Sequence, residues 1–341
     1  MTDLTTASMS GDLPDGCRLV LQPGHPPVLQ LAHGELPAPA VRQSLTRHGA
    51  VLLRGLGLGV PTDLAQVAHA LGVTPMAERE GFAARDDVGQ GVYSASRWPA
   101  EEPMCMHHEL SYADEVPGTA LFGCLRAPEK GGATALADAR HVLGALPADL
   151  VAPFERHGWL LARHYGEVGL SWAEAFGTDD PEAVSAYCRD HAVEHCWLPD
   201  GSLRTVQRRA AVVRHPVLGE RLWFNQVAFL NEFTMDPAVR EYLVSLYGPD
   251  ALPFTTFYGD GTPVPEQVVA AVNDAYAAVA VSEPWQAGDV LVVDNLRTAH
   301  SREAYRGERD IVALFGDPVR LPGHVRPGAT DRPLRDIQEP S

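Results

Sequence analysis

Strand-like segments that lie far apart in the chain, with helical segments between them, most constrain the fold. Apolar runs or alternation predict strands at 50–54, 118–126, 133–137, 221–225, 289–293 and 311–315. Helical spacing occurs at 38–48, 62–71, 171–176, 181–191, 236–247 and 264–279. This order favours a mainly β fold with helical additions (α+β), of the β-sandwich or jelly-roll kind. A doubly wound parallel sheet is the alternative, and the lack of a G-x-G-x-x-G or G-x-x-x-x-G-K-[ST] loop weighs against it.

The chain is long enough for one large domain with insertions. It has 341 residues, of which 45% are hydrophobic, and it contains no repeat of fixed period. Residues 1–16, which are rich in Asp, Gly, Ser and Thr, and residues 318–341, which are rich in Pro and Arg, are predicted to be tails, which leaves a single domain at 17–317. Within it, 155–210 is expected to be an insertion, either a lid over the site or a packed addition to the domain.

Charge and cysteine content exclude several classes of protein. The formal net charge of −17 would repel nucleic acid and anionic membranes. Five cysteines without a C-x-x-C pair argue against a disulfide framework and a thiolate zinc site. The sequence has no run of 18 apolar residues and no apolar signal core near its start, so a cytoplasmic location is expected.

The pair His107 and Glu109 is a candidate for metal binding. Residues two apart in an extended segment point to the same side, so both could reach one ion. The spacing alone is weak evidence, because about two H-x-[DE] pairs are expected by chance in this composition and the chain has two. The other pair is His33 and Glu35, which precedes a proline-marked helix start with no obvious partner further along the chain.

A second histidine supports the first pair. His300 follows the turn and buried strand at 288–295, and Arg309 comes nine residues later, before the strand IVALF. Two imidazoles and one carboxylate leave adjacent positions open on non-haem iron(II). The planar fork of an arginine binds a carboxylate through two hydrogen bonds, so 2-oxoglutarate could chelate the iron at one end and bind Arg309 at the other. Arg302 is the competing anchor.

These motifs together resemble a known family. The stretch MHHELSYADEVPGTALFGCLRAPEKGGATALADAR at 106–140 and HSREAYRGER at 300–309 resemble the taurine dioxygenase and clavaminate synthase superfamily. They are especially similar to its branch of syringomycin-type aspartyl hydroxylases. WAEAFGTDDPEAVSAYC and WFNQ also have counterparts there, and the resemblance covers roughly 45–317.

The resemblance implies a double-stranded β-helix core and a set of functional residues. His107, Glu109 and His300 would bind Fe(II), Arg309 would anchor 2-oxoglutarate, and Thr134 would donate a hydrogen bond to the same carboxylate. Ser301 and Tyr305 stand where the family usually has Gly and Phe. Related halogenases have a small residue in place of the carboxylate, so Glu109 favours hydroxylation, with desaturation or epoxidation as alternatives.

The implied reaction consumes O2 and 2-oxoglutarate, releases succinate and CO2, and hydroxylates an unactivated C–H bond. By analogy, the substrate is expected to be an amino acid or its derivative, free or carried by an aminoacyl carrier protein, in specialised metabolite (antibiotic) biosynthesis. Arg163 and Asn225 are candidate substrate contacts, although Asn225 could equally be a satisfied buried amide. Arg204, Arg208, Arg209 and Arg214 could form a basic patch for the carrier. The rival hypotheses are a non-catalytic jelly-roll metal-binding protein and a zinc hydrolase, and neither needs Thr134 or Arg309.

Overall fold

The computed structural model describes residues 13, 15–31, 36–248 and 252–325. The helices in this part are α1 (Ala38–His48), α2 (Thr62–Leu71), α3 (Ala139–Ala145), α4 (Ala148–His157), α5 (Trp172–Phe176), α6 (Pro181–Asp190), the 3-10 helix η1 (Glu232–Thr234), α7 (Pro237–Tyr247) and α8 (Glu266–Val279). None of them is long and apolar enough to span a membrane.

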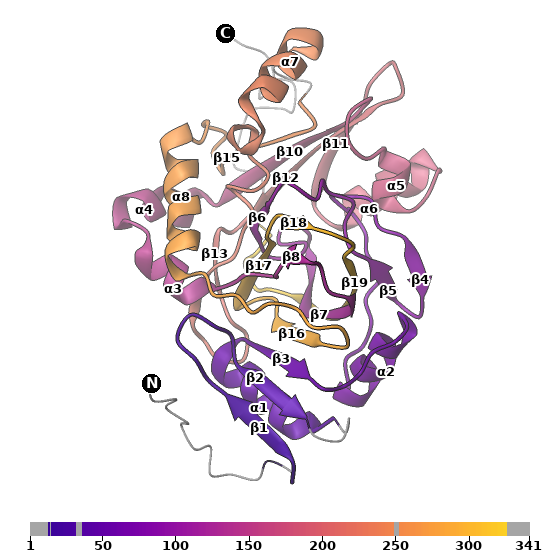
Figure 1. Cartoon of the computed structure of the whole chain (residues 1–341). Coiled ribbons are helices and arrows are strands. Elements are labelled where there is room, and N and C mark those ends of the chain that lie inside the picture. The colour runs from indigo at the N-terminus through magenta and orange to yellow at the C-terminus, as the bar shows by residue number, and fades with distance from the viewer. Residues whose placement is uncertain (1–12, 14, 32–35, 249–251, 326–341) are drawn as a thin grey trace.

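The strands form a large sheet and several small ones (Figure 1). They are β1 (Cys17–Val20), β2 (Val28–Leu31), β3 (Ala50–Arg54), β4 (Asp87–Gly89), β5 (Val92–Ser94), β6 (Met104–His107), β7 (Glu115–Arg126), β8 (Lys130–Gly131), β9 (Leu136–Asp138), β10 (Trp159–Tyr165), β11 (Val193–Trp197), β12 (Leu203–Arg209), β13 (Val212–Arg214), β14 (Arg221–Trp223), β15 (Phe254–Tyr258), β16 (Val290–Asp294), β17 (Thr298–Arg302), β18 (Tyr305–Arg306) and β19 (Asp310–Arg320). The chain is therefore a mixed, strand-rich α+β protein.

The large sheet has the order β1-β2-β3-β16-β7-β19-β5-β4. Among the strands that the structure describes, only β2 and β3 pair in parallel, whereas β7 pairs antiparallel with both β16 and β19. The doubly wound parallel alternative is therefore wrong. The long ladder between β7 and β19 joins segments that lie far apart in the sequence.

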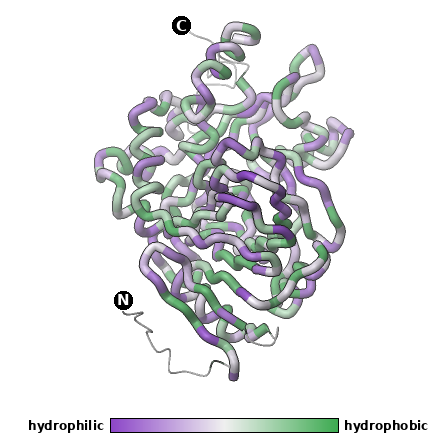
Figure 2. The backbone as a smooth tube through the Cα atoms, viewed as in Figure 1, coloured by the Kyte–Doolittle hydropathy of each residue, from purple (hydrophilic) through white to green (hydrophobic). Residues whose placement is uncertain are grey.

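Both faces of this sheet are buried. Along β16, Val290 and Val292 face one core, which α1 and α2 cover, while Leu291 and Val293 face a second core that also contains Phe122. This alternation follows from the two-residue period of a strand. Figure 2 shows hydrophobic stretches running through the large sheet and its covering helices. The second core lies beside the small sheet β6-β17-β9, since the ring of Phe122 lies 4.9 Å from that of His300.

Residues 155–210 form most of a separate sheet. β10, β11 and β12 lie in the order β11-β12-β10-β15, and β15 completes the sheet from outside the predicted range. α5 and α6 pack on it around a small core of its own that includes Tyr165, Phe176 and Leu203. Whether this insertion acts as a lid stays a prediction.

Several expected boundaries differ from the structure. β19 continues through Arg320, and Leu321 and His324 behind it are buried, so the tail predicted at 318–341 begins later than expected. Pairing with β7 holds this extension in place. The strand expected at 133–137 is limited to β9, and the strand expected at 221–225 ends at Trp223. Most of the predicted N-terminal tail, 1–16, lies outside the described residues.

Candidate metal centre

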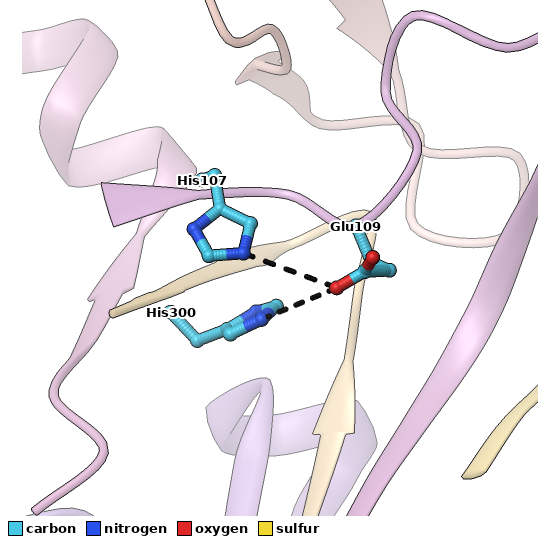
Figure 3. A group of neighbouring side chains, drawn as sticks. All are labelled: His107, Glu109 and His300. Atoms are coloured by element: carbon cyan, nitrogen blue, oxygen red, sulfur yellow. Dashed lines mark ion pairs between the residues drawn. The ribbon is translucent and has the colours of Figure 1, made fainter. Parts of the chain in front are cut away.

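Three side chains that are far apart in the sequence converge at the small sheet (Figure 3). His107 ends β6 and lies directly opposite His300 of the antiparallel β17, and Glu109 follows two residues after His107. The Oε2 atom of Glu109 lies 3.9 Å from Nε2 of His107 and 3.7 Å from Nε2 of His300. One ligand atom from each residue lies within 4.8 Å of the others. The structure thus brings together the three residues that the sequence indicated.

The chemistry of these three groups fits a divalent metal ion. All three side chains are buried. Nδ1 of His107 lies 2.8 Å from the carbonyl oxygen of Cys105, so a proton on Nδ1 donates there and the Nε2 lone pair faces Glu109. Burial, and then the neighbouring His300, lower the pKa of His107 to about 3, which keeps its imidazole neutral as a metal ligand must be. Two imidazoles and one carboxylate suit non-haem iron(II).

His108 points to the other side of the segment, as expected for a neighbour in an extended chain. It is fully buried, and its ring nitrogens lie 2.7 Å and 3.1 Å from the carbonyl oxygens of Asn295 and Trp223. Burial lowers its pKa to about 4. Because both ring nitrogens face backbone carbonyl oxygens, His108 has a structural role and is not available to the metal cluster.

Arg85 is a close neighbour of the cluster that the sequence did not indicate. Its Nη2 donates to Oε2 of Glu109 at 3.2 Å, its Nη1 donates to Glu78 at 3.2 Å, and its Nε donates to Ser96 at 2.9 Å. The guanidinium carbon lies 4.7 Å from the ring centroid of Phe315. Burial alone would raise the pKa of Glu109, but the charge of Arg85 and the interactions with His300 and His107 together outweigh burial and hold this pKa below its usual range. The carboxylate is therefore ionised and ready to bind a cation.

A cavity of about 50 Å³ adjoins the two imidazoles. Its wall includes His107, His300, Thr134 and Arg309, so it joins the metal cluster to both residues expected at the co-substrate. Nε of Arg309 donates to the carbonyl oxygen of Gly132 at 3.0 Å. Within the described part of the chain, its Nη1 and Nη2 atoms form no hydrogen bond or ion pair. Burial lowers the pKa of Arg309 to about 10, so it remains a cation at neutral pH.

The competing anchor, Arg302, lines the same cavity but is already engaged. Its Nη1 donates to the carbonyl oxygen of Trp98 at 3.1 Å, and its Nη2 donates to the carbonyl oxygens of Pro99 and Glu102. These bonds hold the segment that precedes β6. Of the two arginines, Arg309 therefore has the free donors that a carboxylate needs.

The two expected substrate contacts differ in their surroundings. Asn225 is buried, with Nδ2 donating to the carbonyl oxygen of Ala211 at 3.0 Å and Oδ1 accepting from the Val227 amide at 3.1 Å. It thus matches the alternative of a satisfied buried amide. Arg163 donates to the carbonyl oxygens of Glu80 and Gly81, both at 2.8 Å.

Arg163 nevertheless borders a second, larger cavity of about 460 Å³. Phe82, Trp98 and Phe254 form an aromatic part of its wall. Phe82 and Trp98 contact Phe229 at ring-centroid distances of 5.1 Å and 6.3 Å, and Phe229 stacks on His107 at 4.8 Å. An aromatic cluster therefore connects this cavity to the metal-binding imidazole. The pair His33 and Glu35 lies outside the described residues.

Comparison with known proteins agrees with this geometry. The family model described as "Taurine catabolism dioxygenase TauD, TfdA family" matches residues 24–315. The chain is 34% identical over 290 residues to the dapdiamide synthesis protein DdaC of Enterobacter agglomerans, covering 85% of this chain and 88% of that protein. It is 28% identical over 280 residues to a clavaminate synthase-like protein of Arabidopsis thaliana, covering 79% and 82% of the two chains.

Solved structures show the same fold at low sequence identity. The crystal structure of PvcB from Pseudomonas aeruginosa has a TM-score of 0.57 at 17% identity, with 94% of this chain and 99% of that chain covered. A taurine dioxygenase from Burkholderia xenovorans has a TM-score of 0.53 at 18% identity, with 95% and 98% covered.

The chain therefore belongs to the TauD, TfdA family of dioxygenases. It is an oxygenase that depends on iron(II) and 2-oxoglutarate, as the resemblance implied.

Proposed function

We propose that the protein hydroxylates an unactivated C–H bond of an amino acid or an amino-acid derivative in specialised metabolite biosynthesis. The observation that carries the proposal is the buried cluster of His107, Glu109 and His300 beside a cavity that contains Thr134 and the free donors of Arg309. The similarity to a protein of dapdiamide synthesis supports the substrate class and the biosynthetic role.

In this proposal, each residue of the cluster has one task. Nε2 of His107, Nε2 of His300 and one oxygen of Glu109 would hold iron(II), which would supply the oxidative chemistry that uses O2. Arg309 binds the carboxylate of 2-oxoglutarate remote from the metal through Nη1 and Nη2, and Thr134 donates a hydrogen bond to the same group. 2-Oxoglutarate leaves as succinate and CO2. Because Glu109 occupies one metal position, hydroxylation is favoured over halogenation.

The substrate is proposed to bind on the side of Phe229, in the larger cavity bordered by Arg163. The rings of Phe82, Trp98 and Phe229 exclude water beside His107 and leave an apolar approach to the metal. Arg163 then acts mainly through its charge and its stacking on Tyr165, whose ring centroid lies 4.6 Å away, because its Nη atoms hold backbone carbonyls. The insertion 155–210, which contributes Arg163, would cover the substrate as a lid.

Three further features belong to the same proposal. The large sheet and the β6-β17-β9 sheet are taken as the two halves of a double-stranded β-helix. The enzyme is expected to act in the cytoplasm on a free substrate or one bound to a carrier protein. For a carrier, the basic patch expected from the sequence does not form as such, since Arg208 and Arg209 are buried and only Arg214 of the four is exposed. A free substrate is therefore the simpler proposal.

The test is substrate-dependent turnover of the iron-loaded enzyme. Amino acids and their acylated derivatives would be screened for stimulation of succinate formation, and products would be analysed by mass spectrometry. The proposal expects a product 16 mass units heavier than its substrate and succinate in equal amount. A product lighter by two hydrogens would establish desaturation instead. Absence of succinate from iron-loaded, folded protein across the screen would contradict the proposal.

A further inference from the structure

One buried side chain holds the backbone of Glu109 from both sides. Asn295 lies in the turn directly after β16 and is fully buried. Its Oδ1 accepts a hydrogen bond from the Glu109 amide at 2.8 Å, and its Nδ2 donates to the Glu109 carbonyl oxygen at 3.0 Å. The second hydrogen of Nδ2 is donated to the carbonyl oxygen of Pro117 at 2.8 Å. Both Nδ2 hydrogens and Oδ1 are thus engaged with the segment that carries the carboxylate.

The chain near Glu109 needs such a partner. β6 ends at His107, so no strand ladder pairs the Glu109 amide and carbonyl, and buried backbone groups without partners are strongly disfavoured. The next residue, Leu110, is buried and has φ of 53°, in the left-handed region that residues other than glycine rarely adopt. Such a conformation persists only where the surroundings fix it. The amide of Asn295 supplies part of that constraint.

The same turn leads to the second imidazole. His300 follows Asn295 by five residues, on β17. The Asn295 backbone is itself fixed, because its amide donates to the Gly118 carbonyl oxygen at 3.0 Å and its carbonyl oxygen lies 2.7 Å from Nδ1 of His108. The connection between β16 and β17 therefore sets the position of His300 through the chain and that of Glu109 through the Asn295 side chain.

We propose that Asn295 is a positioning residue of the metal centre, which orients the Glu109 backbone so that its carboxylate faces His107 and His300. The inference rests on the proposed metal site. Removing groups that orient metal ligands typically lowers metal affinity about 10- to 100-fold, and we expect a loss in this range.

The test uses the metal-free full-length chain and Co(II) as the probe, without turnover. Asn295→Asp keeps the shape and the acceptor but turns an oxygen toward two carbonyls, and Asn295→Ser removes most of the contacts with a smaller side chain. The matched control is Asn231→Ser. Asn231 is equally buried, and it also bonds a backbone amide, that of Phe233, and the Thr256 side chain. Dissociation constants come from absorbance titrations, and urea unfolding gives the stability of each variant.

We expect Co(II) affinity to fall about 10- to 100-fold in Asn295→Ser, and at least as far in Asn295→Asp, while Asn231→Ser loses stability but keeps its affinity. If Asn295→Asp does not fold, the comparison of the two serine variants decides. Wild-type Co(II) affinity in a folded Asn295 variant would overturn this inference but not the proposed metal site. A loss of Co(II) affinity in Asn231→Ser equal to that in Asn295→Ser would have the same consequence. A wild-type protein that binds no Co(II) would instead overturn the proposed metal site.

Discussion

Replacing Arg309 with methionine should greatly weaken the binding of 2-oxoglutarate without removing the metal site. In the structure Nε of Arg309 bonds the Gly132 carbonyl, while Nη1 and Nη2 have no partner among the described residues. Both are proposed to donate to the co-substrate carboxylate. At the lower end of the range for hydrogen bonds to charged groups, about 1.5 kcal/mol each, the two bonds contribute about 3 kcal/mol. That corresponds to a loss of about 100-fold in affinity.

The assay is a titration of 2-oxoglutarate into iron(II)-loaded protein without oxygen, followed by its visible charge-transfer absorption. Arg302→Met is the matched control, because Arg302 lines the same cavity but donates to the carbonyls of Trp98, Pro99 and Glu102. This control should lower the free energy of unfolding and change the affinity by less than about threefold, under 1 kcal/mol. An Arg309→Met variant with nearly wild-type affinity would refute the assignment of the anchor, and a large loss in Arg302→Met alone would transfer it to Arg302.

Three further predictions concern the cavity, the acid sensitivity and the carboxylate. Gly132 has φ of 71°, and an added Cβ would lie 2.9 Å from Cβ of Tyr305. Gly132→Ala should therefore lower the free energy of unfolding in urea by about 1–3 kcal/mol. An unchanged urea midpoint would contradict this prediction. Burial lowers the pKa of His324 from 6.5 to about 3, so the folded protein keeps this imidazole neutral. As the pH falls below 6.5 the unfolded chain binds a proton that the folded protein does not, so the free energy of unfolding decreases until the pH approaches 3. The free energy of unfolding of each protein would be measured at about pH 7.5 and about pH 5. The decrease between these two pH values should be about 2 kcal/mol smaller in His324→Leu than in wild type. Equal decreases would show that the folded protein does not keep the histidine neutral. Glu109→Ala should fold but lose iron(II) affinity by at least about 10-fold in a chelator competition, and retained affinity would mean that the carboxylate is not a ligand.

The sequence predicted the parts of the site that depend on local spacing. The two-residue period of an extended segment predicted that His107 and Glu109 share a side, although Glu109 lies in the turn directly after β6. His300 could be placed because a buried strand precedes it. The pairing of His107 with His300 across β6 and β17 was not visible in either segment. It could be inferred only from the combination of motifs.

Contacts made by distant segments could not be predicted. Arg85 precedes Glu109 by 24 residues in a stretch with few regular elements, and only the path of the folded chain brings the two together. The charges of Arg208 and Arg209 suggested a surface patch, whereas the structure buries both side chains in β12. Arg209 donates to backbone carbonyls of the preceding turn, including that of His191. Charge along a sequence does not show whether such partners exist.

The central claim is that His107, Glu109 and His300 bind iron(II) and that 2-oxoglutarate chelates it in the adjoining cavity. Anaerobic addition of iron(II) and 2-oxoglutarate to metal-free protein tests it directly, through the weak visible metal-to-ligand charge-transfer band. The account predicts a band in the wild type that His300→Ala abolishes. Folded, iron-loaded wild-type protein without a band, or a His300→Ala variant with the same band, would contradict it.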